Sequence, residues 1–274
     1  MSSEARPRGP APSNVDLAAD ALREAIADGR IQPGERIKEI PLSQALGISR
    51  GPIRDALRLL ERDGLVQLIQ NRGAVVPEVR ALDVLEVYAL RASLGSLALH
   101  KLMLEGPVPE RVLERHLARL RDAVQRGRSR HAADADLRYQ AAIIAASGLP
   151  RVLAEFDRLT WQVRIFISTV EISVEEKLAR ILSEVEALHE AIIDGRQTDA
   201  ERLWREKFEA WVRDLVELLP EEFDDELWAS LTSPRGPALH GYAPEPDAPR
   251  PAGRAVPRVG RRDDRQRRDA GDPG

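Results

Sequence analysis

Apolar residues recur at helical spacing along most of the chain, and only one short stretch near residues 65–76 alternates as β-strands do. Beyond about residue 81, glycines and prolines separate six long amphipathic segments. These predict helices over 81–104, 109–126, 131–147, 150–171, 174–194 and 198–219, with a shorter one at 222–230. Consecutive helices joined by short breaks predict an antiparallel helical bundle.

The N-terminal part of the pattern predicts shorter helices separated by glycine turns. The first runs over 15–28, with Asn14 as its N-cap and Gly29 just past its end. A second runs over 41–46 and ends at Gly47. A third helix follows at once, so the order is helix, glycine turn, helix.

The third helix begins after Ser49 and has two distinct faces. One face carries the apolar residues at i, i+3, i+4 and i+7, namely Ile53, Ala56, Leu57 and Leu60. Another face carries Arg54, Arg58 and Arg62. Two strands, 65–70 and 74–76, follow and are joined by a hairpin turn at Asn71, Arg72 and Gly73.

The predicted fold is therefore mainly α, with an N-terminal winged helix-turn-helix that has a small β-hairpin wing. A C-terminal antiparallel all-α bundle of six or seven helices follows. Proline-rich tails that cannot bury enough apolar surface flank this part of the chain. We predict disordered tails at 1–13 and 233–274, a winged-helix domain at 14–77 with its helix-turn-helix at about 39–58, and an all-helical domain at 78–232, to which the family resemblance described below assigns effector binding and dimerisation.

Charge is distributed unevenly between these parts. Residues 14–80 contain ten basic and ten acidic side chains, whereas residues 81–233 contain 20 basic and 28 acidic ones. A neutral first domain leaves room only for a small, focused basic face.

The chain has no cysteine, which excludes disulfides, thiolate metal sites and a catalytic thiol. No stretch approaches the roughly 18 apolar residues that span a bilayer, so we expect a cytoplasmic protein without a membrane partner.

The basic face is expected at the exposed start of the third helix. Ser49, Arg50 and Gly51 lie at that start, Arg54 and Arg58 follow at steps of four residues, and Arg72 and Gly73 form the hairpin tip. The planar guanidinium of arginine pairs with guanine edges or with phosphate, so this arrangement is typical of a DNA-reading helix and wing. The alternative is a solvated helix face whose arginines pair with Asp55, Glu61 or other nearby acids.

Three segments within this region resemble the GntR family of regulators. They are 31–37 (IQPGERI), 46–57 (LGISRGPIRDAL) and 61–66 (ERDGLV), and the resemblance covers residues 15–77 nearly without gaps. It implies a homodimer on double-stranded, palindromic operator DNA. In that family, residues that match Arg50 and Arg54 read or grip the DNA, and the turn at Arg72 and Gly73 is the wing tip. Gly51 stands where many members have threonine, so one expected side-chain contact is missing.

The helical part, over about 81–219, resembles the FadR-type ligand-binding domain called FCD. That family usually holds a metal with an aspartate, a histidine four residues later and two further histidines. Here Asp136 and His189 match two ligands, whereas Gln140 and Lys207 stand at the other two positions. A protonated lysine has no lone pair for a metal. We therefore expect no cofactor, with a divalent metal at Asp136 and His189 as the alternative. Lys207 would replace the metal charge by pairing with Asp136 or with an anionic ligand.

Two arginines complete the candidate effector site. The resemblance places Arg91 where the family directs an arginine to the ligand carboxylate, with Gly95 where a glutamate is common. Arg164 is a looser candidate, and a surface salt bridge is the alternative for both. His189 could equally be a core histidine. Helical spacing makes five aromatic residues core or dimer-contact side chains, namely Trp161, Phe166, Trp204, Phe208 and Trp211.

These observations predict a non-enzymatic DNA-binding regulator that is controlled by a small anionic effector. The family resemblance favours a repressor over an activator. One alternative is a regulator with a degenerate, effector-independent pocket. Gln140 and Lys207, which depart from the ligand set of the family, support this alternative. Another is a helical enzyme that uses Asp136 and His189 as acid and base. The chain has no nucleophile motif, phosphate-binding loop or complete metal set to support that enzyme.

Overall fold

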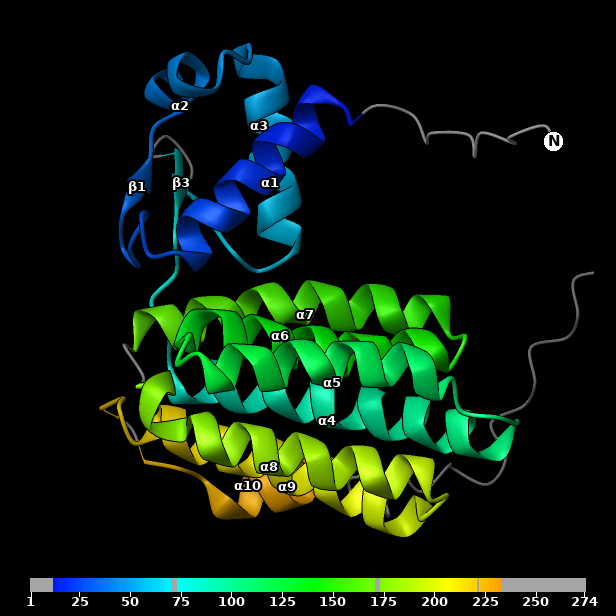
Figure 1. Cartoon of the computed structure of the whole chain (residues 1–274). Helices are drawn as coiled ribbons and strands as arrows, with labels where there is room; N and C mark the ends of the chain where they lie inside the picture. Colours follow the sequence, from blue (N-terminus) through cyan, green and yellow to red (C-terminus); the bar gives the residue numbers. More distant parts are fainter. Residues whose placement is uncertain (1–11, 70–72, 171–172, 221, 233–274) are drawn as a thin grey trace, which may run out of the picture. The chain divides into compact units, whose positions relative to one another are not determined.

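A computed structural model describes residues 12–69, 73–170, 173–220 and 222–232. The predicted helices are present, with ends shifted by up to three residues. In the N-terminal region they are α1 (Asn14–Ala27), α2 (Glu39–Leu46) and α3 (Arg50–Arg62) (Figure 1). The bundle comprises α4 (Ala81–Leu104), α5 (Glu110–Gln125), α6 (Ser129–Ala146), α7 (Pro150–Thr169), α8 (Val174–Ile193), α9 (Gln197–Val216) and α10 (Asp225–Thr232).

The wing is a three-stranded antiparallel sheet rather than a simple hairpin. Its strands β1 (Arg36–Ile37), β2 (Gln67–Ile69) and β3 (Gly73–Val75) lie in the order β1-β3-β2. Ile37 pairs with Ala74, and Leu68 pairs with Ala74 from the other side. Strand β1 was not predicted, because two residues are too few to show an alternation of period two. The turn residues 70–72, which include the predicted wing-tip residue Arg72, lie outside the described residues.

The start of α1 differs from the expectation. Ser13, not Asn14, is the N-cap, and Asn14 is the first helical residue. The Ser13 side chain accepts a hydrogen bond from the Asp16 backbone N–H, while the Asp16 carboxylate accepts one from the Ser13 backbone. This reciprocal capping box satisfies two helix-end donors, whereas an Asn14 cap would satisfy one.

Helix α3 has one buried apolar face and one exposed face that carries arginines. Ile53, Ala56, Leu57 and Leu60 are all buried, as the spacing predicts, and they pack with Leu22 and Ile26 of α1 in a shared core. Because residues one helical turn apart lie on the same face, Arg54 and Arg58 are left on the exposed side. The hydrophobic stripe of α3 therefore determines which way its arginines point.

The bundle has its own hydrophobic core. In that core α5 packs on α6, α4 packs on α9, and α8 packs on both α5 and α9 (Figure 1). Four of the five aromatic residues singled out in the sequence are buried, namely Phe166, Trp204, Phe208 and Trp211. Trp161 is half-buried and packs instead against the core that contains α1 and α3.

A close contact joins α4 to α9 at the centre of the bundle. Trp204 is fully buried, and its indole N–H donates a 3.2 Å hydrogen bond to the carbonyl oxygen of Ala92. A Cβ atom at Gly95 would lie 2.0 Å from Cζ2 of the Trp204 ring. Glycine is therefore required at position 95, because the indole ring occupies the space of any side chain there.

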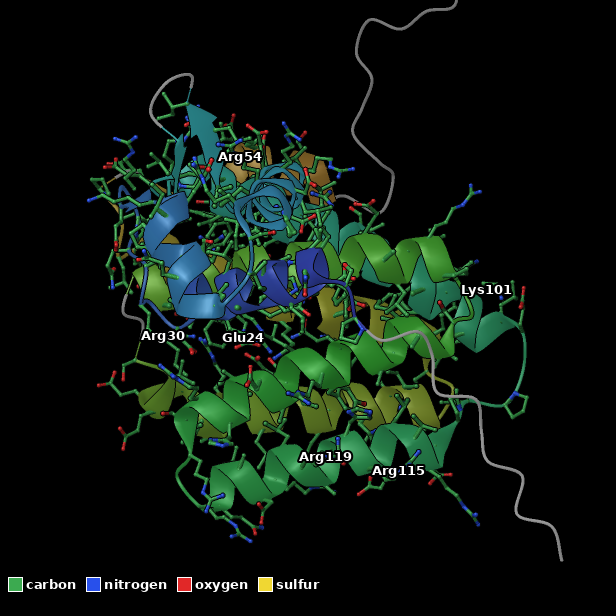
Figure 2. All side chains as sticks on the ribbon, turned by 90° about the horizontal axis from the view of Figure 1, so that it is seen from above. Glu24, Arg30, Arg54, Lys101, Arg115 and Arg119 are labelled. Atoms are coloured by element: carbon green, nitrogen blue, oxygen red, sulfur yellow. The ribbon has the colours of Figure 1, made fainter. Side chains whose placement is uncertain are left out.

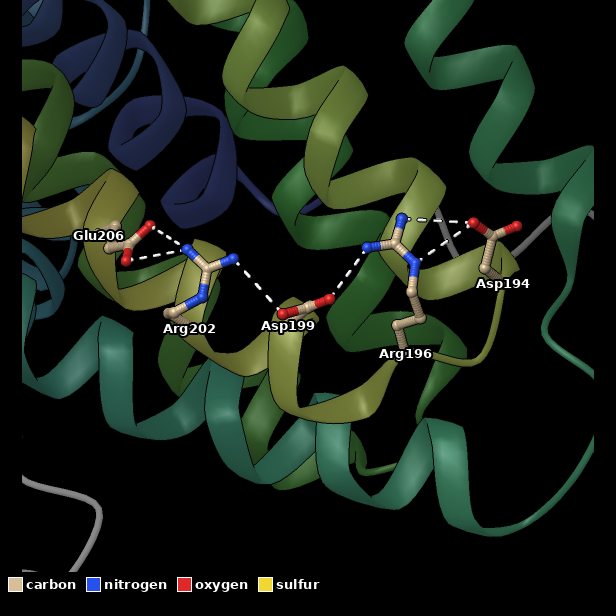
Figure 3. Close-up of polar contacts among 5 residues, drawn as sticks. All are labelled: Asp194, Arg196, Asp199, Arg202 and Glu206. Atoms are coloured by element: carbon tan, nitrogen blue, oxygen red, sulfur yellow. Dashed lines mark hydrogen bonds and ion pairs between the residues drawn. The ribbon is translucent and has the colours of Figure 1, made fainter.

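A chain of ion pairs covers the surface where α8 turns into α9 (Figure 3). Arg196 bridges Asp194 and Asp199, and Arg202 bridges Asp199 and Glu206. The pairs are exposed, so each contributes little to stability. Arg196 and Arg202 thus both have acidic partners on α9 or at the adjoining turn.

Replacing Gly95 by alanine should lower the free energy of unfolding by about 1–3 kcal/mol, because the buried Trp204 ring must shift. Gly51→Ala is the matched control, since Gly51 is also helical but a Cβ there meets nothing within 4 Å. That control should be neutral or stabilising by up to about 1 kcal/mol. Chemical denaturation measures both variants, and equal stabilities would contradict the close contact.

Candidate functional site

The first candidate surface is the exposed start of α3. Ser49, Arg50, Gly51, Arg54 and Arg58 are all exposed there, and Figure 2 labels Arg54 on this helix. The Ser49 side chain makes no capping hydrogen bond. Free backbone donors at the start of a helix favour anions, and arginines on the same face add positive charge. This end of α3 can therefore approach a phosphate backbone.

The arginines of α3 form exposed ion pairs within the protein. Glu39 of α2 accepts from Arg54 at 2.8 Å and from Arg50 at 3.4 Å. Arg58 pairs with Asp55 at 3.1 Å. Exposed pairs of this kind contribute at most about 1 kcal/mol, so a DNA phosphate can replace the carboxylate.

Glu39 is a partner of these arginines that the sequence pattern did not indicate. Of the two acids named for a solvated helix face, Asp55 pairs with an arginine of α3, whereas Glu61 has a different partner. Glu61 instead accepts a hydrogen bond from the backbone N–H of Leu68. The partner on α2 becomes visible only when the two helices are packed together.

The wing contributes a further cation, Arg36, which was not among the predicted site residues. Gly73 begins β3 with a φ of 82°, a left-handed conformation that favours glycine. A Cβ at Gly73 would lie 3.7 Å from Nε of Arg36, an exposed side chain on β1. Arg36 is therefore placed beside the hairpin because β1 pairs with β3.

The second candidate site is a buried polar cluster inside the bundle, centred on Arg91 of α4. Arg91 has no solvent exposure and donates to Gln140 at 2.7 Å and to Thr160 at 2.5 Å. Its guanidinium also lies 3.9 Å from the centre of the Phe156 ring. Burial lowers the pKa of Arg91 to about 10, so the group stays protonated at neutral pH.

Lys207 of α9 carries the second buried charge. Its ammonium lies 3.0 Å from Asp136 and 3.2 Å from Glu184, and the Lys207 and Asp136 side chains are 2% and 6% exposed. The pairing of Lys207 with Asp136 suggested by the sequence is thus present. A second carboxylate, Glu184, was not foreseen, because it reaches the pair from α8.

Little space remains between these groups. A cavity of about 20 Å³ is lined by Tyr88, Arg91, Asp136, Gln140, Phe208 and Trp211, among others. That volume holds about one water molecule, whereas pockets for organic ligands measure roughly 300–1,000 Å³. Side chains of the protein therefore fill the centre of the bundle.

His189 and Arg164 belong to other clusters. Nδ1 of His189 lies 2.9 Å from the Tyr139 hydroxyl, and Nε2 lies 3.3 Å from Glu114. Burial is the main cause of the lowered pKa of His189, which favours the neutral ring at neutral pH. Arg164 pairs with Asp134 at 2.8 Å and does not line the central cavity.

The metal implied by the resemblance does not fit these residues. Asp136 is held by an ammonium, which repels a divalent cation, and His189 is engaged with Tyr139 and Glu114. Within the described ranges, no three histidine, aspartate or glutamate side chains gather closely enough to hold an ion. Likewise, no described helix is long and apolar enough to cross a membrane.

Two family models match the chain. One, described as bacterial regulatory proteins of the gntR family, matches residues 15–76, and the FCD domain model matches residues 86–210. Among curated relatives, the uncharacterized HTH-type transcriptional regulator YdhC of Bacillus subtilis is 38% identical over 107 residues, which cover 39% of this chain and 48% of YdhC. The repressor MngR of the mannosyl-D-glycerate transport and metabolism system of Escherichia coli is 40% identical over 63 residues, or 23% of this chain and 26% of MngR. The chain spans about half the length of the curated relatives it matches.

Solved structures share the fold. McbR/YncC of Escherichia coli aligns with a TM-score of 0.66 and 20% identity, covering 76% of this chain and 99% of that one. A protein assigned as a GntR transcriptional regulator from Rhodococcus sp. RHA1 aligns with a TM-score of 0.65 and 23% identity, covering 75% and 99%. At these identities the likeness establishes the fold, a winged helix-turn-helix with a helical C-terminal domain.

Lys207→Met should lower the free energy of unfolding by about 3–5 kcal/mol, because Asp136 is left buried without its cation. Adding Asp136→Asn to Lys207→Met should restore part of that loss, since the uncompensated charge is then gone. Lys177→Met is the control, because Lys177 is more exposed and its partner Asp214 also pairs with Arg180. Denaturant titration compares the four proteins, and equal losses at positions 207 and 177 would contradict a buried pair.

Proposed function

Because the chain belongs to the GntR family of bacterial regulatory proteins and carries an FCD domain, we propose that it is a transcription regulator that binds a palindromic operator as a homodimer. The observation that carries this proposal is the exposed start of α3, where the partner of Arg50 and Arg54 among the described residues is the exchangeable carboxylate of Glu39. A helix presented in this way enters the major groove of DNA with its N-terminal residues at the base edges. The name of MngR supports a repressor role.

A row of exposed leucines on α4 supports the dimer. Leu90, Leu97 and Leu104 follow at intervals of seven residues and are 52%, 52% and 70% exposed. Intervals of seven place side chains on one face of a helix, and such a seam is typical of helix pairing. If two α4 helices packed antiparallel about a two-fold axis between Ser93 and Leu94, Leu90 would face the partner's Leu97. Glu86 would then face the partner's Lys101, a favourable charge pair.

Helix α7 supports a connection between the bundle and the DNA-binding region. Thr160 and the Phe156 carbonyl of this helix accept hydrogen bonds from Arg91. Two residues beyond Thr160, the Gln162 side chain donates to the Asp63 carbonyl just after α3, and Ile165 is buried in the core of α1 and α3. A change in the bundle that moves α7 would therefore alter the position of α3, which is how an effector would shift the population of DNA-binding states.

A second candidate function is a regulator whose bundle interior binds no effector. The 20 Å³ cavity and the Lys207–Asp136 pair favour it, because an organic anion would have to displace packed side chains. An acid-base enzyme gains no support, since Asp136 and His189 have separate partners in separate clusters. Both candidate functions share the same DNA-binding surface.

Arg50→Ala and Arg54→Ala should each weaken operator binding by about 1–3 kcal/mol, because each removes a cation from the groove-facing end of α3. Fluorescence anisotropy at one salt concentration measures the effect on duplexes that the wild-type protein selects from a random library. Arg126→Ala is the control, since Arg126 lies on the bundle surface and pairs with Asp122. Unchanged affinity in both α3 variants would remove these arginines from the interface.

Leu90→Glu combined with Leu97→Glu should convert the dimer to a monomer, because four carboxylates would face one another across the seam. Light scattering coupled to size-exclusion chromatography reports the mass. Leu218→Glu is the matched control, as Leu218 is 53% exposed but lies outside α4. A variant that remains dimeric would place the dimer contact elsewhere.

A further inference from the structure

A basic groove runs along the outside of the bundle between α5 and α6. It has a volume of about 530 Å³ and contains the side chains of Arg119, Arg128, Arg138, His116 and His131. Its volume lies within the range of small-molecule pockets and greatly exceeds that of the central cavity. The groove therefore offers the space for a ligand that the bundle interior lacks.

The charges of this groove are unbalanced. Its two acids are engaged elsewhere, because Asp122 pairs with Arg126 at 2.7 Å and Asp134 pairs with Arg164 at 2.8 Å. Among the described residues, the guanidinium groups of Arg119, Arg128 and Arg138 form no hydrogen bond or ion pair, although the backbone of Arg128 bonds to Ala123 and Ala132. In contrast, Arg196 and Arg202, the arginines of the ion pairs in Figure 3, each bridge two carboxylates. Three guanidinium groups at the edge of one groove are thus available to an anion.

His116 adds an unpartnered ring nitrogen to the groove. Its Nδ1 is buried and has no hydrogen-bond partner among the described residues. Burial, followed by the charges of Arg119, Arg115 and Arg138, lowers the pKa of His116. Arg115 and Arg119 lie about one turn apart on α5 (Figure 2). Because the neighbouring cations repel a proton from this ring, they would equally attract a negatively charged ligand.

We propose that the groove between α5 and α6 binds a small polyanion with several carboxylate or phosphate groups, and that it is the effector site of the bundle. The proposal rests on the regulator function proposed above and moves its effector site from the packed interior to the surface. A small ligand fits better than nucleic acid, because residues 81–233 carry 28 acidic against 20 basic side chains and repel a long polyanion.

The groove is connected to the helix that contacts the DNA-binding region. Asp134 lines the groove, and its partner Arg164 lies on α7 with its guanidinium 4.9 Å from the centre of the Trp161 ring. Trp161 packs against the core of α1 and α3. An anion that draws Arg119 and Arg138 together would change the surroundings of Asp134, and through Arg164 it would bias α7.

Isothermal titration calorimetry with citrate and with pyrophosphate tests the site on the full chain, and the two probes distinguish carboxylate from phosphate recognition. At least one probe should bind, and Arg119→Ala combined with Arg138→Ala should weaken that binding about tenfold or more. Arg202→Ala, a matched exposed arginine on α9, should bind like the wild type. Failure of both probes to bind, or equal weakening in the control, would overturn the proposal.

Operator binding separates this proposal from the regulator function. The double variant without ligand should bind selected duplexes as the wild type does, because its substitutions lie far from α3 in sequence and are exposed. The binding probe should change operator affinity several-fold in the wild type and leave the double variant unaffected. A probe that binds in the groove without changing operator affinity would overturn the effector assignment. A wild type that binds no duplex would instead overturn the regulator function.

Discussion

The ammonium of Lys207, held between Asp136 and Glu184 at 3.0 and 3.2 Å, is the interaction on which the organisation of the bundle depends. It joins α6, α8 and α9 around one buried charge. Removing charges from water is costly, and the cost is recovered only when the partners are fixed in good geometry. Arg91 of α4 offsets the same cost of burying a charge by donating hydrogen bonds to Gln140 and Thr160. The centre of the bundle is therefore held together by its own cations.

This arrangement changes where the bundle can interact with ligands. A metal would need the aspartate that Lys207 already holds, and an organic anion would need volume that Trp204, Phe208 and Trp211 occupy. The exterior differs in character, because Arg119, Arg128 and Arg138 of the groove have no acidic partners among the described residues, whereas the arginines of the α8–α9 turn do. Unpaired charge on the surface, rather than paired charge inside, marks the place where an anion could add binding energy.

Much of the DNA-binding region could be predicted from local sequence. The spacing of Ile53, Ala56, Leu57 and Leu60 indicated the buried face of α3 correctly, and thereby the exposure of its arginines. The Ser13 cap, strand β1 and the role of Glu39 were missed. A capping box depends on reciprocal side-chain geometry, a two-residue strand has no periodicity, and Glu39 meets Arg54 from a different helix.

Helix positions, the buried stripes and the identity of the two domains follow from the order of residues, because helical periodicity and turn chemistry act over a few neighbouring positions. Which charges are partnered does not follow, because it depends on helices that are distant in sequence. The family resemblance suggested that Lys207 pairs with Asp136. In contrast, the second partner Glu184, the close packing of Trp204 on Gly95 and the filling of the cavity arise only when α4, α6, α8 and α9 pack together. Burial and neighbours set the energy of a charge, and both are properties of the packed chain.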